Sequence, residues 1–204
     1  MSVDAILRRL QFLFVCAGVL LCGWCTGVFV QARYHQAMDN RRLEEARLYK
    51  PPDSAPTQPR RAVREPGSLV GRLEIPRLKF KAIVLEGSDH RTLSRGIGLI
   101  PQTPEPGESG NVVLGGHRDT FFRPLRGIRA GDRIRMVTPV ASYLYQVDWT
   151  AVVDPSDNST LKATPRKSLT LVTCYPFRYI GPAPQRFIVR AHQLPQGVVT
   201  TASY

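Results

Sequence analysis

An uncharged apolar run near the start of the chain limits what the rest of it can form. Residues 10–30 contain no charged side chain, and Arg8 and Arg9 stand just before them. At about 1.5 Å of rise per residue, a helix of this length spans a hydrocarbon core of about 30 Å. A cleaved signal peptide is the main alternative, but its apolar core is usually about 7–15 residues long. The run therefore predicts an uncleaved, single-pass transmembrane anchor.

The anchor divides the chain into five predicted segments. Residues 1–9 form an N-terminal cytoplasmic tail, residues 10–30 the anchor, residues 31–67 a polar stalk with a proline-rich linker, residues 68–195 a folded domain and residues 196–204 a C-terminal tail. Lysine and arginine counts around the anchor, taken literally, place the folded domain inside the cell. Long domains often cross the membrane regardless of such charge, so we expect an extracytoplasmic domain.

Short β-type runs separated by turn residues make up the folded domain. Gly, Pro, Asp and Asn supply the turns, and two short stretches, 90–94 and 125–128, suit single helical turns. Seven or eight such strands predict an all-β domain, either a closed barrel or a sandwich. The runs are Leu69–Ile75, Phe80–Leu85, Asn111–Leu114, Arg133–Val137, Ser142–Val147, Thr150–Val153, Ser168–Thr173 and Arg186–Arg190.

Charge and cysteine usage exclude several classes of function. The net charge of +12 is dispersed along the chain, without a zinc-finger spacing or an RNA-recognition motif, so no nucleic-acid partner is expected. Three of the four cysteines lie inside the apolar run, which leaves Cys174 without a disulfide partner in its own domain. The acidic loop residues that could bind calcium are too sparse to predict a metal, and no cofactor is expected. They are Glu105, Glu108, Asp154 and Asp157.

Three residue types typical of nucleophilic catalysis stand at the ends of predicted strands. Cys174 directly follows one strand, and Arg186 begins the next after a loop rich in Pro and Gly. His117 follows another strand through two glycines; taken alone, it could equally be an ordinary turn histidine. A thiol becomes a strong nucleophile when it ionises beside a cationic group, and strand ends are common places for reactive side chains.

The segments that carry these residues resemble the three signatures of sortases. They are Val113–Asp119 (VLGGHRD), Leu169–Cys174 (LTLVTC) and Arg186–Val189 (RFIV), in the order and spacing of that family. The Cys-Tyr-Pro-Phe and Gly-Pro-Ala-Pro pieces are most similar to class D, with class E close. The resemblance implies a closed eight-stranded sortase-type β-barrel and a cysteine transpeptidase of the bacterial cytoplasmic membrane.

The resemblance also implies roles and partners. Cys174 would be the nucleophile, His117 the acid and base, and Arg186 the group that stabilises the oxyanion. The partners would be secreted proteins with a C-terminal LPxTG-like sorting signal, and an amine acceptor on a cell-wall precursor or a pilin lysine. Thr173 could orient the substrate or simply favour the strand.

Three further residues near the thiol and the histidine have open roles. Tyr175 and Phe177 could line the substrate site or pack over the end of the barrel. Asp119 could orient His117, two residues away, or face elsewhere.

Two competing functions remain. One is a catalytically inactive β-barrel that binds a peptide or an anionic polymer at the membrane surface. The intact set of thiol, imidazole and guanidinium argues against it, because a binding module has no need of an unpaired thiol. The other is a papain-type cysteine enzyme, in which the nucleophile usually precedes its histidine; here His117 comes before Cys174.

Overall fold

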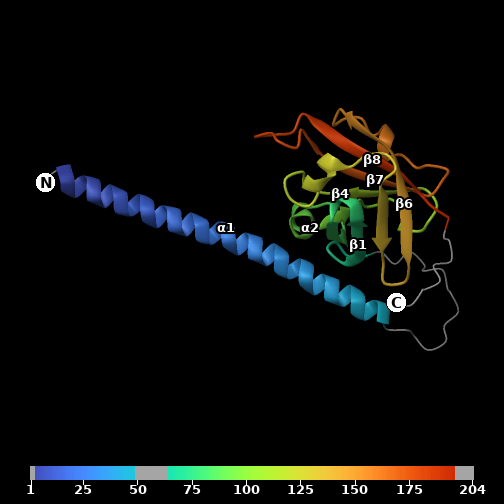
Figure 1. Cartoon of the computed structure of the whole chain (residues 1–204), viewed down its shortest axis with the longest axis horizontal. Helices are drawn as coiled ribbons and strands as arrows, with labels where there is room; N and C mark the ends of the chain where they lie inside the picture. Colours follow the sequence, from blue (N-terminus) through green and yellow to red (C-terminus); the bar gives the residue numbers. More distant parts are fainter. Residues whose placement is uncertain (1–2, 49–63, 196–204) are drawn as a thin grey trace. The chain divides into compact units, whose positions relative to one another are not determined.

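A long helix and a closed β-barrel make up the protein (Figure 1). The computed structural model describes residues 3–48 and 64–195. The helix is α1 (Val3–Leu48), and the short helices are α2 (His90–Arg95), η1 (Pro76–Leu78), η2 (Arg123–Gly127) and η3 (Ser159–Leu161). The strands are β1 (Leu69–Ile75), β2 (Phe80–Glu86), β3 (Ile97–Leu99), β4 (Asn111–Gly115), β5 (Arg133–Val137), β6 (Ser142–Val153), β7 (Ser168–Tyr175) and β8 (Gln185–Gln193).

The eight strands close into one barrel in the order β1-β2-β3-β4-β7-β8-β6-β5. The pairs β2–β3 and β4–β7 are parallel, and the other pairs are antiparallel. The closed alternative of the predicted all-β fold is therefore confirmed. Closure leaves no free sheet edge, so every strand of the barrel has two neighbours.

Two strands differ from the prediction. The runs Ser142–Val147 and Thr150–Val153 form a single strand, β6, whose pairing with β8 shifts register between Val147 and Trp149. A bulge interrupts the alternation of apolar residues there, which made one strand look like two. The sequence did not predict β3, because a strand of three residues is too short to show an alternating pattern.

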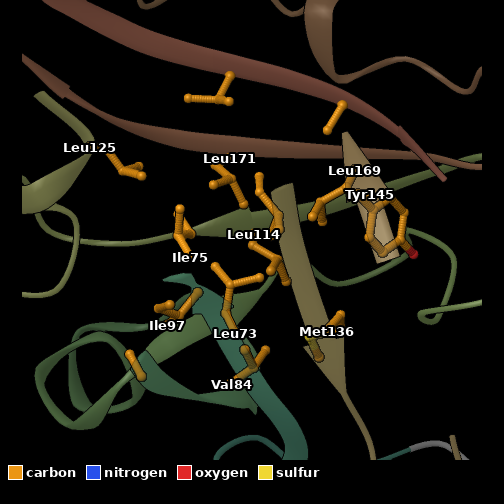
Figure 2. Packing of buried hydrophobic residues seen from close by; sticks show 14 of the residues in the cluster. Leu73, Ile75, Val84, Ile97, Leu114, Leu125, Met136, Tyr145, Leu169 and Leu171 are labelled. Atoms are coloured by element: carbon orange, nitrogen blue, oxygen red, sulfur yellow. The ribbon is translucent and has the colours of Figure 1, made fainter. Parts of the chain in front are cut away.

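The barrel interior is filled by side chains from all eight strands (Figure 2). Alternate residues of each strand point inward, as on β7, where Leu169 and Leu171 are fully buried. Phe122, just before η2, and Leu125, within η2, join the same cluster. On β7 the residues between the core positions, Thr170, Val172 and Cys174, consequently face outward.

Helix α1 is long and apolar enough to cross a membrane, by length and composition. The chain forms two compact units, Met1–Met38 and Asp39–Tyr204. The second unit therefore begins inside the segment 31–67 that we expected to be stalk and linker. Asp39 and Leu43 are buried, with 5% and 0% of their surface exposed.

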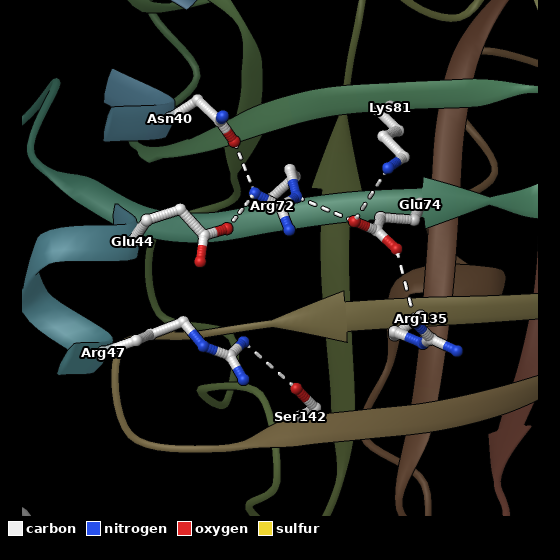
Figure 3. A network of polar contacts seen from close by, with 8 residues as sticks. All are labelled: Asn40, Glu44, Arg47, Arg72, Glu74, Lys81, Arg135 and Ser142. Carbon is white, nitrogen blue, oxygen red and sulfur yellow. Dashed lines mark hydrogen bonds and ion pairs between the residues drawn. The ribbon is translucent and has the colours of Figure 1, made fainter. Parts of the chain in front are cut away.

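Polar contacts join the last turns of α1 to the outer side of β1 (Figure 3). Arg72 on β1 donates from Nη1 to Oε1 of Glu44 at 2.7 Å and from Nε to Oε1 of Glu74 at 2.8 Å. It also donates to the side-chain oxygen of Asn40. Arg47 donates to Ser142 at 3.2 Å. Residues 39–48 are thus held by the barrel through both a buried leucine and shared ionic contacts.

Candidate active site

Strand register places Cys174 directly opposite Arg186. The two residues are Cα partners in the antiparallel pair β7–β8, so their side chains lie on the same face. That face is the outside of the barrel, because Leu171 on β7 and Val189 on β8 point into the core. Cys174 is half-buried and carries a free thiol. A free thiol and a cation are therefore neighbours on one surface.

Hydrogen bonds tie the segment of His117 to the strand of Cys174. The parallel pair β4–β7 continues past Gly115, with the amide of Gly116 donating to the carbonyl of Val172 at 3.2 Å. The hydroxyl of Thr173 donates to the carbonyl of Gly116 at 2.7 Å. His117 therefore begins the turn beside the end of β7, where Cys174 lies.

Glycine at position 116 allows this turn to fold back on itself. A Cβ at Gly116 would lie 2.8 Å from Cδ2 of Phe122, closer than real side chains approach. The amide of Phe122 donates to the carbonyl of His117 at 2.9 Å, which closes the turn over the buried aromatic ring. The second glycine of the Gly-Gly-His sequence is thus required by packing.

The structure places the other predicted site residues as follows. Asp119 is exposed, and the ring of His117 is contacted by His90 of α2, with centroids 6.2 Å apart. Thr173 is buried and its hydroxyl is used by Gly116, so any contact with a substrate would come from its main chain. The role of Asp119 in orienting His117 and the role of Thr173 toward a substrate stay predictions.

Tyr175 and Phe177 belong to a cluster of three aromatic rings. Their centroids are 5.9 Å apart, and both lie near Phe187, at 6.2 Å and 5.2 Å. Phe177 and Phe187 pack against the barrel core. The cluster therefore supports the start of the β7–β8 connection, and contact with a substrate remains a prediction for both residues.

Arg186 donates hydrogen bonds to main-chain carbonyls just before it in the sequence. Its Nη1 donates to the carbonyl of Gln185 at 3.1 Å and to that of Ala183 at 3.5 Å. The guanidinium carries a permanent positive charge with further N–H groups for an anionic oxygen.

Sequence reasoning missed two residues that hold the β6–β7 connection on this face. The Asn111 amide donates to the carbonyls of Thr160–Lys162 at 3.1–3.4 Å, and its oxygen accepts from Thr170 at 2.6 Å. Arg190 donates to the carbonyl of Thr160 and lies over the ring of Trp149. Burial lowers the pKa of Arg190. The sequence signal that could have identified Arg190 is its positive charge within the otherwise apolar pattern of β8.

In the part of the chain that the structure describes, no three His, Cys, Asp or Glu side chains are grouped as metal ligands. Glu105 pairs with Arg64 at 2.9 Å, and Asp154 accepts from Ser156. These carboxylates are thus engaged in local contacts.

A thiol, a histidine segment and a guanidinium at the ends of three adjacent strands match a known domain. The model of the sortase domain matches residues 73–194, which is more than half of the chain. The chain belongs to the sortase family. All three predicted signature segments lie inside the matched region.

Individual sortases show the same relationship. Sortase D of Bacillus subtilis is 38% identical over 126 residues, covering 61% of this chain and 64% of its own length. Sortase SrtE1 of Streptomyces coelicolor is 30% identical over 195 residues, covering 83% of this chain and 53% of its own. The chain thus spans between half and two thirds of these two relatives. The identity to Sortase D supports the resemblance to class D.

Solved structures confirm the sortase barrel. A sortase D5 transpeptidase of Clostridium perfringens superposes with a TM-score of 0.67 at 24% identity, covering 79% of this chain and 99% of that one. Sortase C1 of Streptococcus agalactiae gives a TM-score of 0.59 at 29% identity, covering 67% of this chain and 72% of that one. The predicted fold is therefore confirmed.

Proposed function

We propose that this sortase is a membrane-anchored cysteine transpeptidase that cleaves an LPxTG-like sorting signal. The observation that carries the proposal is the pairing of Cys174 with Arg186, with the segment of His117 bonded to the end of the same strand. Residues 68–195 form the catalytic domain and residues 10–30 the anchor in this proposal.

The proposed reaction has two steps. The Cys174 thiolate attacks the carbonyl carbon of a Thr–Gly-type peptide bond, and Arg186 stabilises the negative charge that develops on the oxygen. The C–N bond then breaks, His117 protonates the departing amine, and a thioester remains. In the second step an amine acceptor attacks the thioester and loses its proton to His117. A new amide forms, and the Cys174 thiolate is released.

The test is a peptide cleavage assay on the full chain in detergent. Quenched LPxTG and LAxTG peptides are offered with and without triglycine, and mass spectrometry follows the products. We expect cleavage and a new amide with triglycine for the wild type, and neither for Cys174→Ala. The matched control replaces the three other cysteines, Cys16, Cys22 and Cys25, with serine and should remain active. Equal product from wild type and Cys174→Ala contradicts the proposal.

The inactive binding module predicts a different result. In that case the peptide would bind without cleavage, and intact-mass analysis would find no acyl adduct on Cys174 with a thiol-reactive peptide analogue. A half-buried thiol beside a guanidinium favours the enzyme over this second function.

We propose that the catalytic domain lies on the outer side of the bacterial cytoplasmic membrane. The proposal is supported by the chemistry, because the substrates would be secreted proteins and a cell-wall or pilin amine. A membrane-impermeant maleimide should label Cys174 in intact cells or spheroplasts and fail to label Cys174→Ser. Labelling only after the membrane is opened would place the domain inside.

A further inference from the structure

The residue after His117 is fastened to the connection between β7 and β8. Arg118 donates from its Nη2 to the carbonyl of Tyr179 at 2.9 Å and to the carbonyl of Gly181 at 3.0 Å. Its guanidinium carbon lies 5.6 Å from the centre of the Tyr179 ring. One side chain thus makes three attachments to residues 61 and 63 positions away in sequence.

The same connection also contacts Arg186. Nη1 of Arg186 donates to the carbonyl of Ala183 in the connection at 3.5 Å, and to the carbonyl of Gln185, the first residue of β8, at 3.1 Å. The tip of the connection, residues 179–181, lies two to four residues before Ala183 and is the part that Arg118 holds. The connection is therefore tied to the histidine segment at one point and to the guanidinium at another.

Apolar packing does not hold the tip. Ile180, between the two acceptor residues, is fully exposed at 101%, and Tyr179 is exposed at 49%. A surface connection that buries so little apolar area opens easily unless polar contacts fix it. The contacts from Arg118 supply that restraint. Its Nη1 is buried without a partner within the described residues, so the side chain loses solvation to reach this position.

We propose that Arg118 is a positioning residue that sets Arg186 relative to His117 and Cys174. Arg118 touches no reacting atom in this proposal; it acts by fixing the β7–β8 connection from the histidine side. The inference rests on the proposed transpeptidase function for its kinetic consequence, while the restraint itself does not depend on catalysis.

Arginine suits this task better than lysine. A planar guanidinium can bridge two carbonyls from one nitrogen and lie over an aromatic ring at the same time. A lysine ammonium can reach one or both carbonyls, but it has no plane to place against Tyr179. We therefore expect Arg118→Lys to restore part of what Arg118→Ala loses.

The experiment uses the full chain in detergent, with Arg118→Ala, Arg118→Lys and the control Arg126→Ala. Arg126 is an exposed arginine of η2 on the same β4–β5 connection. Amide hydrogen exchange of residues 177–183 and the kcat and KM for the peptide are measured for each variant. We expect faster exchange in Arg118→Ala, with kcat lowered about 10- to 100-fold and KM changed less. Arg118→Lys should lie between, and Arg126→Ala should match the wild type.

A second variant pair tests whether Arg118 acts through Arg186. If it does, Arg118→Ala should cost little further activity in an Arg186→Lys background, because the group it positions is already altered. If the loss of kcat in the double variant equals the product of the two single losses, Arg118 and Arg186 act separately, and the proposal is overturned. So would unchanged exchange in Arg118→Ala, or a loss of kcat that Arg126→Ala shares.

The outcomes separate this inference from the proposed function. If the wild type cleaves no peptide, the transpeptidase proposal fails, while hydrogen exchange still decides whether Arg118 restrains the connection. If Arg118→Ala does not fold, Tyr179→Leu removes the ring contact and keeps both carbonyl acceptors; faster exchange of residues 177–183 is again expected, and unchanged exchange there counts against the proposal.

Discussion

Thr173 donates its hydroxyl to the carbonyl of Gly116 at 2.7 Å, which joins the residue before Cys174 to the residue before His117. Fifty-seven positions of sequence separate the two partners. The bond is mostly shielded from water, since Thr173 is 3% exposed. It therefore fixes Cys174 and His117 relative to each other through their main chains.

We expect Thr173→Val to lower kcat about 5- to 10-fold, because a buried hydrogen bond contributes about 1 kcal/mol and its loss loosens the two segments. The shape of the residue is nearly unchanged, so folding should be retained. Steady-state kinetics with the sorting peptide check this. Thr173→Ser keeps the hydroxyl and is the matched control; a Val variant as active as the Ser variant would remove the role assigned to the bond.

Arg186 should be needed for its charge and for its geometry. Arg186→Gln is expected to lower kcat/KM about 100- to 1000-fold, the usual cost of losing a group that stabilises an oxyanion. Arg186→Lys should fall between, since it keeps the charge and loses the planar set of donors. The control is Arg178→Gln, because Arg178 is an exposed arginine of the connection between β7 and β8. Equal losses of kcat/KM in Arg178→Gln and Arg186→Gln would mean that activity depends on the overall positive charge of this surface and not on Arg186 in particular.

The β6–β7 connection should open when Asn111 is replaced. Asn111→Ala removes the amide that holds three consecutive carbonyls, so local opening becomes easier and trypsin cleaves after Lys162 about tenfold faster or more. Asn158→Ala is the control, because that residue precedes η3 without a side-chain cap. Gel analysis over time measures the rate. Cleavage at the same rate in both variants would contradict a bracing role for Asn111.

Leu43 should stabilise the barrel unit although it lies on α1. The side chain is fully buried, and Leu43→Ala is expected to cost about 2–5 kcal/mol of unfolding free energy. Leu48→Ala, on the same helix and 85% exposed, should leave stability unchanged. Thermal unfolding of the full chain in detergent compares them. Matching melting temperatures for the two variants would show that the end of α1 contributes nothing to the unit.

Asp132 should make stability depend on acid pH. Its hydrogen bond with Arg77 lowers the pKa of Asp132 below the ordinary value of 3.8, despite burial that raises it. The folded state thus favours the charged form, so the stabilisation is present above about pH 4 and is lost as pH falls through the lower folded pKa. Asp132→Asn should melt a few degrees lower at pH 7 and lose less on acidification. Parallel pH profiles for both proteins would exclude the effect.

Short-range patterns predicted most of the fold. The alternation in Leu69–Ile75 and the apolar runs before Cys174 and after Arg186 identify strands directly, because period two is visible within a few residues. The barrel order is not visible in this way. That β8 lies between β6 and β7, or that β4 runs parallel to β7, depends on pairings between distant segments.

The candidate site shows the same division. Cys174, His117 and Arg186 stand out by residue type at strand ends, and the structure brings their segments together. Arg118 and Asn111 were missed, since their importance lies in carbonyl acceptors about 50 to 60 residues away, which carry no side-chain signature. The buried end of α1 was missed for a similar reason: one leucine among polar residues resembles a solvated stalk.

The position of β8 in the barrel also determines when Cys174 and Arg186 come together during folding. A chain that is synthesised from its amino terminus produces β7, with Cys174, before it produces β8, with Arg186. Because β8 inserts between β6 and β7, each of those strands lacks one of its two neighbours until β8 has been made. A partly synthesised chain that lacks β8 therefore carries the thiol of Cys174 without Arg186 opposite it. In the proposed reaction, the thiol and the guanidinium can therefore act together only after β8 has been added to the barrel.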